Sequence, residues 1–176
     1  MDKAAARVIA LGTFDGLHSG HQAVIRTCIE LAREKGLESA VYTFIENPKS
    51  LFGTAPLPLM TPEEKRQGLY SLGVQQVFEV HFTRELAALT PEEFMQMLIR
   101  EYAPAALVAG EDYTFGARAG GTTQTLRELC AANDIQAVIV PLVTLDGEKI
   151  SSTRIRNAIK SGDLKAAEQI ARGEYV

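Results

Sequence analysis

The sequence has few cysteines, no tryptophan, no run of basic residues and no long apolar segment, and these absences exclude several classes of protein. Two cysteines in 176 residues are too few for a disulfide framework. Cys28 and Cys130 fall on apolar helical faces, and neither has a Cys or His partner at metal-ligand spacing, so we expect buried, reduced thiols. No apolar run approaches the ~18 residues of a membrane span, and we find no signal-peptide core. We therefore expect a cytoplasmic protein without a membrane partner.

The charge balance also argues against a nucleic-acid partner. There are 18 basic and 22 acidic residues, a formal net charge of −4, and no cluster of lysine or arginine. A small anionic ligand remains compatible with this balance, because local donors matter more for such a ligand than global charge. The hydrophobic share of 46% and the charged share of 23% are typical of globular proteins. The length predicts a single domain over residues 1–176.

Apolar runs that predict strands alternate with stretches that predict helices. The expected strands are residues 8–11, 39–44, 74–80, 105–109 and 135–140, and the expected helices begin near residues 20, 61, 90, 122, 151 and 163. This alternation predicts an α/β fold, a Rossmann-like, doubly wound parallel sheet of about five strands with helices on both faces. Ligands of such folds bind beyond the carboxyl ends of the strands. The candidate motifs all fall at those ends.

The first motif is the segment GTFDGLHSGH at residues 12–21, directly after the first strand. Its glycines allow close backbone approach to a ligand, and a helix N-terminus offers free N–H groups. His18 and His21 can add hydrogen-bond donors or positive charge. The combination suits a polyphosphate, although one histidine could instead belong to a turn and the other to a helix cap. A zinc site is disfavoured, because the spacing is not H-x-x-x-H and no third ligand is evident.

Three further segments carry polar or aromatic groups at strand ends. Residues 151–156 read SSTRIR, which predicts either a second phosphate-binding helix start or a plain serine cap with solvated arginines. Residues 110–121 form a glycine-rich loop that is long for a connection. Its Tyr113 and Phe115 could flank a flat ring or pin the loop to the core. Asn47, followed by a proline, could reach a phosphate or a magnesium-bound water, or mark an ordinary turn.

Together these segments resemble a known family. Residues 12–21 and 150–156 resemble the two signatures of the nucleotidyltransferase α/β-phosphodiesterase superfamily, of the HxGH type. Residues 43–48, 110–116 and 162–167 are similar to the FMN adenylyltransferase module of bacterial bifunctional FAD synthetase, and the resemblance runs from about residue 8 to residue 175. It implies the reaction ATP + FMN → FAD + pyrophosphate, with Mg²⁺.

The resemblance also implies a role for each matched position. His21 would stabilise charge on the α-phosphate and His18 would hold the adjacent phosphates. Arg154, with Ser152 and Thr153, would bind the β- and γ-phosphates. Asn47, at a position where many members have histidine, would support the phosphate or metal region, and Mg²⁺ would bind through the phosphates without an assigned protein ligand. The remaining expected site residues shape the nucleotide pocket (Gly12, Thr13, Phe14 and Gly16) or lie near adenine and flavin (Gly110, Asp112, Tyr113 and Phe115). Asp15 is expected to fix its loop and not to contact ligand.

Members of this family usually carry a riboflavin kinase domain at the C-terminal side. By resemblance we expect that domain to be absent from residues 1–176, and FMN to come from a separate riboflavin kinase or from a removed kinase domain. Two alternatives remain open. The chain could transfer an adenylyl or cytidylyl group to a different phosphorylated acceptor, or it could bind a nucleotide without turnover.

Overall fold

The structure, a computed structural model, describes residues 6–173. Its centre is a five-stranded sheet in the order β3-β2-β1-β4-β5, and all four pairings are parallel. The strands are β1 (Arg7–Leu11), β2 (Glu38–Phe44), β3 (Gln76–Val80), β4 (Pro104–Gly110) and β5 (Gln136–Val140). The predicted parallel α/β sheet is therefore confirmed.

The strand order places a topological switch point between β1 and β4. The chain first adds β2 and β3 on one side of β1, and then crosses to add β4 and β5 on the other side. The connections that leave the carboxyl ends of β1 and β4 consequently turn to opposite faces of the sheet. A crevice opens between such diverging connections, and it is where open parallel sheets bind ligands. Residues 12–18 and 111–121 are those two connections.

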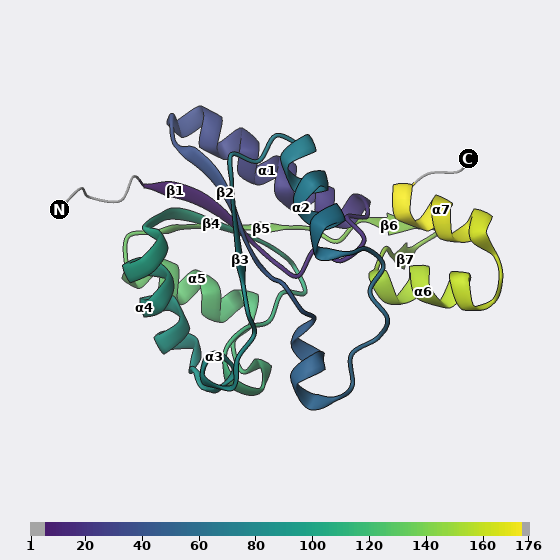
Figure 1. Ribbon diagram of the computed structural model, residues 1–176. Coiled ribbons are helices and arrows are strands. Elements are labelled where there is room, and N and C mark those ends of the chain that lie inside the picture. The colour runs from purple at the N-terminus through teal and green to yellow at the C-terminus, as the bar shows by residue number, and fades with distance from the viewer. Residues whose placement is uncertain (1–5, 174–176) are drawn as a thin grey trace.

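Helices cover both faces of the sheet, as predicted (Figure 1). α1 (Ser19–Lys35) and α2 (Pro62–Ser71) pack on one face, and α4 (Pro91–Tyr102) and α5 (Thr123–Ala132) pack on the other. Side chains alternate along a strand. Val8 and Ala10 of β1 accordingly belong to the core under α1, whereas Ile9 and Leu11 belong to the core under α4 and α5. Cys28 and Cys130 are free and buried, one in each core, as expected.

Local signals set the helix starts. The Thr61 hydroxyl accepts from the Glu64 N–H at 3.1 Å, and the Glu64 carboxylate accepts from the Thr61 N–H at 2.7 Å, which is a capping box. Thr90 and Glu93 form the same arrangement at the start of α4. α1 ends at Gly36, in the left-handed conformation, as its sequence predicts.

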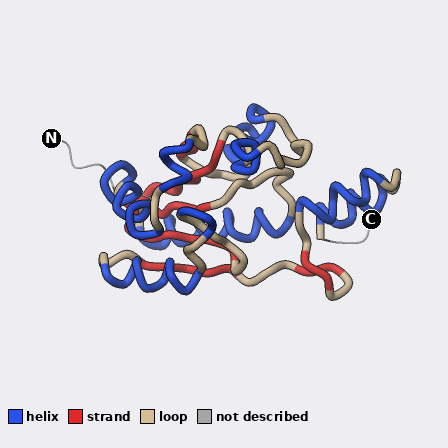
Figure 2. Tube along the Cα trace, turned by 90° about the horizontal axis from the view of Figure 1, so that it is seen from below, coloured by secondary structure: helices blue, strands red, loops and turns tan. Residues whose placement is uncertain are grey.

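A small unit lies beyond the carboxyl end of the sheet (Figures 1 and 2). It comprises the hairpin of β6 (Thr144–Leu145) and β7 (Glu148–Lys149), followed by α6 (Ser152–Lys160) and α7 (Leu164–Arg172). Its apolar centre is separate from the two sheet cores and contains Leu145, Ile150, Ile155, Ala167 and Ile170. From outside the unit, Leu59 packs against this centre.

Several short elements were not predicted. They are the 3-10 turns η1 (Pro48–Phe52) and η2 (Ala117–Ala119), the helix α3 (Arg84–Ala88), and the hairpin β6–β7, where the sequence indicated only a turn. The strand expected from residue 74 begins at Gln76, because the Val74 N–H still bonds to the Leu69 carbonyl, at 3.3 Å, behind the end of α2. Among residues 6–173, no helix is long and apolar enough to cross a membrane.

Candidate functional site

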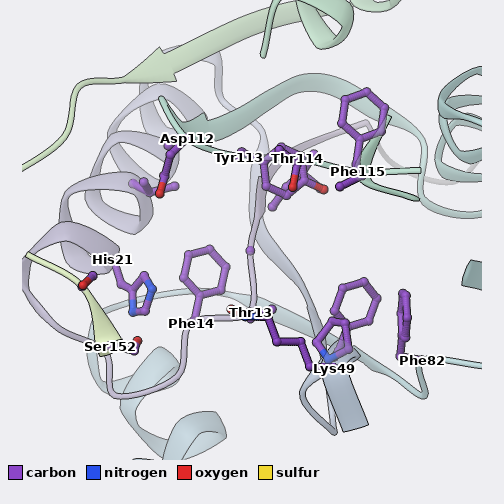
Figure 3. Close-up of a pocket in the computed structure, with 18 of the residues that line it drawn as sticks. Thr13, Phe14, His21, Lys49, Phe82, Asp112, Tyr113, Thr114, Phe115 and Ser152 are labelled. Carbon is purple, nitrogen blue, oxygen red and sulfur yellow. The ribbon is translucent and has the colours of Figure 1, made fainter. Parts of the chain in front are cut away.

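A cavity of about 1190 Å³ opens at the switch point, at the carboxyl ends of β1 and β4. Figure 3 shows its two ends: His21 and Ser152 lie at one end, and Phe82 lies at the other with Lys49 nearby. The predicted residues that line it come from the loop after β1, the start of α1, the loop after β4 and the start of α6 (Gly12, Thr13, Phe14, His18, His21, Gly110, Asp112, Tyr113, Phe115 and Ser152). The fold therefore brings together most of the residues that the motifs singled out.

His18 and His21 stack at the start of α1, with ring centroids 3.6 Å apart and planes inclined by 18°. His18 is the N-cap of that helix, since its Nδ1 accepts from the His21 backbone N–H at 3.3 Å. His18 is therefore the histidine that caps the helix, which was one of the alternatives from sequence. Capping does not remove it from the site, because both histidines line the cavity. A neutral His18 that accepts at Nδ1 carries its proton on Nε2 and can donate from there.

Both imidazoles are neutral near pH 7. Burial, and then the charge of Lys149, lowers the pKa of His18 to about 4. Burial, and then repulsion from His18 in its protonated form and from Lys149, lowers the pKa of His21 well below its ordinary value. The pair therefore presents neutral hydrogen-bond donors in the free protein. Of the two possibilities that the sequence left open for these histidines, donors or positive charge, the lowered pKa values favour donors. Within residues 6–173, His21 Nδ1 is buried without a hydrogen-bond partner, a cost that a ligand oxygen or a water would relieve.

The loop after β1 is held from outside the cavity by Asp15. Its carboxylate accepts from the Leu59 N–H at 3.0 Å and pairs with Arg156, whose Nε donates to the Leu57 carbonyl at 2.7 Å. Asp15 thus fixes the loop, as expected. Gly16 does not line the cavity; a Cβ there would lie 2.8 Å from Leu59. Its contribution to a nucleotide site would come through the turn and not through direct contact.

The start of α6 differs from the prediction in one respect. Ser151 caps the helix by accepting from the Arg154 N–H at 3.2 Å, and Ser151 and Ser152 line the cavity, but Thr153 and Arg154 do not. The Arg154 guanidinium donates to the carbonyls of Leu145 and Glu148 at 3.0 and 3.1 Å. It therefore contacts the β6–β7 hairpin. Direct phosphate binding by Arg154 stays a prediction. In this arrangement the guanidinium faces the hairpin and does not line the cavity.

Asn47 and a buried lysine lie at a second, smaller cavity of about 240 Å³. Asn47 caps η1 by accepting from the Lys49 N–H at 2.9 Å. Lys65 donates to the Phe44 carbonyl at 2.6 Å and to the Thr13 carbonyl at 3.3 Å, and its burial lowers its pKa. It thus ties together the ends of β1 and β2. Sequence reasoning missed Lys65, although its place four residues before the buried Leu69 on α2 puts it on the apolar face.

The aromatic residues of the loop after β4 both line the cavity and pin the loop. The rings of Tyr113 and Phe115 stack with centroids 5.7 Å apart, and Phe115 contacts Phe94 of α4 at the same distance. Phe115 and Gly121 exchange two backbone hydrogen bonds, at 3.0 and 2.8 Å, which close the loop. The two alternatives from sequence are therefore compatible. Asp112 pairs with Lys149 of β7, another lining residue that the motifs did not indicate.

The far side of the cavity contains several residues that were not among the expected site residues. Phe44, Phe82 and Leu86 supply apolar surface there, and Lys49, Arg84 and Arg118 supply cations. Within residues 6–173, Asp112 is the one acidic side chain that lines the cavity, and no cluster of three His, Cys, Asp or Glu side chains could hold a metal ion. The cavity therefore suits an anionic ligand with an apolar part.

Comparison with known proteins gives consistent results. Residues 1–154 match the model of the FAD synthetase family. The chain is 36% identical to a bifunctional riboflavin kinase/FMN adenylyltransferase of Bacillus subtilis over 177 residues, covering 99% of this chain and 56% of that protein. It is 32% identical to an FAD synthetase of Listeria monocytogenes, covering 94% of this chain and 68% of that protein. The chain thus spans about half the length of the bifunctional relative.

A solved structure from Streptococcus pneumoniae has a similar fold. It is described as a macrolide-efflux protein, superimposes with a TM-score of 0.85 and is 35% identical, covering 97% of this chain and 56% of that one. The similarity therefore extends over nearly the whole chain, including the small unit beyond the sheet.

Proposed function

Because this chain belongs to the FAD synthetase family, we propose that it is an FMN adenylyltransferase, which transfers AMP from ATP to FMN and releases pyrophosphate. Of the two activities in the name of its bifunctional relatives, this is the one that the matched family model describes. FMN would be supplied by a riboflavin kinase, and the reaction would take place in the cytoplasm.

The observation that carries the proposal is the stacked, neutral pair of His18 and His21 at the start of α1, inside a cavity of about 1190 Å³. Ordinary small-molecule sites have about 300–1,000 Å³, so this cavity is larger than usual, as a site for two substrates would be. The end with the histidines and Ser152 suits phosphates, since it combines donors with the N-termini of α1 and α6. The aromatic end suits a flat ring.

The chemistry requires positioning more than proton transfer. A phosphate oxygen of FMN forms a bond to the α-phosphorus of ATP, while the bond from that phosphorus to the departing pyrophosphate breaks. The nucleophile is already ionised, so no strong general base is needed. Donors held in place before the reaction stabilise the charge that develops on the α-phosphate. His21 would donate to that group, and His18 would donate from Nε2 to an adjacent phosphate.

Magnesium fits this site as part of the substrate. Mg²⁺ usually keeps several waters and binds through nucleotide phosphates with one or two carboxylates. Asp112 offers one carboxylate at the cavity, already paired with Lys149. Asn47 lies in the neighbouring cavity, which shares Thr13 and Phe44 with the larger one. When bound, the ion would neutralise phosphate charge.

The test is to mix the protein with FMN, ATP and Mg²⁺ and to measure FAD and pyrophosphate by chromatography, omitting each component in turn. We expect FAD only when FMN and ATP are both present, and little product when CTP replaces ATP. Binding of ATP without release of pyrophosphate would instead support a nucleotide-binding module without turnover. Pyrophosphate release with a different phosphorylated acceptor, but not with FMN, would support another nucleotidyltransferase.

A further inference from the structure

An ion pair between Lys149 and Asp112 lines the cavity, and the proposed reaction assigns no role to its lysine. Lys149 lies at the end of β7 and Asp112 lies two residues after β4, so the pair joins the small unit to the sheet. The two side chains are 43% and 51% exposed, and both residues line the cavity. Exposed ion pairs of this kind contribute little free energy. Lys149 can therefore exchange Asp112 for a more highly charged partner at small cost.

The ammonium group of Lys149 also acts electrostatically on the histidine pair. It is the charge that most lowers the pKa of His18, and it lowers that of His21 as well. The other charged groups that act on the two rings are Asp112, Asp15 and Lys65. A partly exposed cation beside two neutral donors and a helix N-terminus is an arrangement that suits a polyphosphate.

Arg154 contacts both strands of the hairpin that carries Lys149. The hairpin has two residues in each strand, and a hairpin of this size has little stability of its own. The Arg154 guanidinium donates to the carbonyls of Leu145 in β6 and Glu148 in β7, and its Nε lies 3.4 Å from the Glu148 carboxylate. It thus holds both strands, and Glu148 directly precedes Lys149 in the chain.

We propose that Lys149 binds the polyphosphate of ATP, that Asp112 is its counter-ion while the cavity is empty, and that Arg154 is a positioning residue that acts through the hairpin. The proposal rests on the function proposed above and assigns the phosphate-binding cation of the same site. It also gives Arg154, to which the family resemblance assigned phosphate binding, an indirect role in that binding, although Arg154 does not line the cavity. Asp112 competes with phosphate for Lys149, so the pair weakens the binding of any ligand that carries too little charge to displace it.

The proposal predicts opposite effects for the two partners of the ion pair. Binding of inorganic tripolyphosphate, measured by calorimetry at low salt, should weaken about tenfold in Lys149→Gln, because a charge-assisted hydrogen bond is lost. Lys149→Arg should keep most of the affinity. Asp112→Asn should bind tripolyphosphate more tightly than the wild type, because the competing carboxylate charge is gone. Lys160→Gln, an exposed lysine on α6, is the matched control and should leave binding unchanged.

A double-mutant cycle tests the role of Arg154. Arg154→Gln should weaken tripolyphosphate binding in the wild type but have no further effect in Lys149→Gln, since Arg154 acts through that lysine. Two results would overturn the proposal: wild-type affinity in Lys149→Gln, or equal weakening by Asp112→Asn and Lys149→Gln, which would mean that the pair only holds the structure together. Because the probe is a bare polyphosphate, these results are independent of whether FMN is the acceptor.

Discussion

At the level of single residues, the two histidines of the first motif have different surroundings. His18 uses its Nδ1 to cap α1, whereas His21 Nδ1 has no partner among residues 6–173. His18 is thus committed to the backbone through one nitrogen, and His21 keeps its hydrogen-bonding capacity for a ligand. Spacing alone treated the two as equivalent, and only the folded helix start distinguishes them.

His21→Ala should therefore reduce kcat by about 100–1,000-fold with a small change in KM, as expected for the loss of one donor to the transition state. Steady-state FAD formation checks this, with circular dichroism to show that the variant is folded. His81→Ala is the matched control, since His81 is an exposed histidine paired with Glu46 on the surface. Wild-type turnover in a folded His21→Ala protein would contradict the assignment.

The depressed pKa of His18 makes stability depend on pH. The folded pKa of about 4 lies below the ordinary value of 6.5, so the unfolded chain takes up a proton that the folded protein does not. The free energy of unfolding should then fall as the pH decreases from about 6.5 to 4. His18→Asn keeps an N-cap acceptor and removes this titration. Urea unfolding at pH 7, 6 and 5 should show a shallower decline in this variant; equal slopes would contradict the prediction.

At the level of elements, the loop after β4 is fixed by its contact with the start of α4. Gly116 has φ 75° and ψ 176°, a conformation adopted almost exclusively by glycine. A Cβ there would also lie 2.8 Å from the Pro91 nitrogen. The glycine therefore allows the cavity wall and α4 to touch, so the position of Phe115 depends on it.

Gly116→Ala should destabilise the protein by more than about 2 kcal/mol, since backbone strain and a steric clash combine. Gly147→Ala is the comparison. Gly147 has the same φ of 75°, but within the described part of the chain an added Cβ there would meet nothing closer than 4 Å, so the change should cost about 1–2 kcal/mol. Thermal unfolding of both variants measures the difference. Equal losses would show that the contact with Pro91 contributes nothing.

At the level of the whole molecule, a polar connection joins the small unit to the sheet. The Ser152 hydroxyl donates to the Asp15 carbonyl at 2.8 Å, and Arg156 bridges the Asp15 carboxylate and the Leu57 carbonyl. Both walls of the phosphate end depend on this connection, because Asp15 belongs to the loop after β1 and Ser152 begins α6. Asp15 therefore contributes contacts from both its backbone and its side chain to the position of the small unit.

Arg156→Met should loosen the small unit without unfolding the sheet, because that unit has its own apolar centre. Hydrogen exchange should accelerate in residues 144–172 and stay unchanged in the strands of the sheet, and catalysis should fall because Ser152 is no longer held. Arg26→Met, at an exposed arginine on α1, serves as the control. Global acceleration of exchange would show that the two units unfold together.

Local sequence was sufficient to predict the parallel sheet, the starts of the longer helices and the edge of the sheet at which most motif residues meet. Hydrophobic periodicity and capping signals are local, and the ends of parallel strands must meet at one edge. The shortest elements were missed because two to five residues carry no readable period. Lys65 was missed because a buried lysine depends on carbonyls supplied from elsewhere in the fold, here by Thr13 in the loop after β1 and by Phe44 of β2.

Which basic side chains line the cavity, in contrast, depends on tertiary packing. Arg154 and Arg156 are two residues apart on a helix, so they point in nearly opposite directions, and the sequence does not say which direction faces the ligand. The packing of α6 settles this: Ile155 is buried, Arg154 holds the hairpin and Arg156 holds the loop after β1. Lys149, outside every motif, reaches the cavity because two distant segments are brought together by contacts that local sequence does not encode.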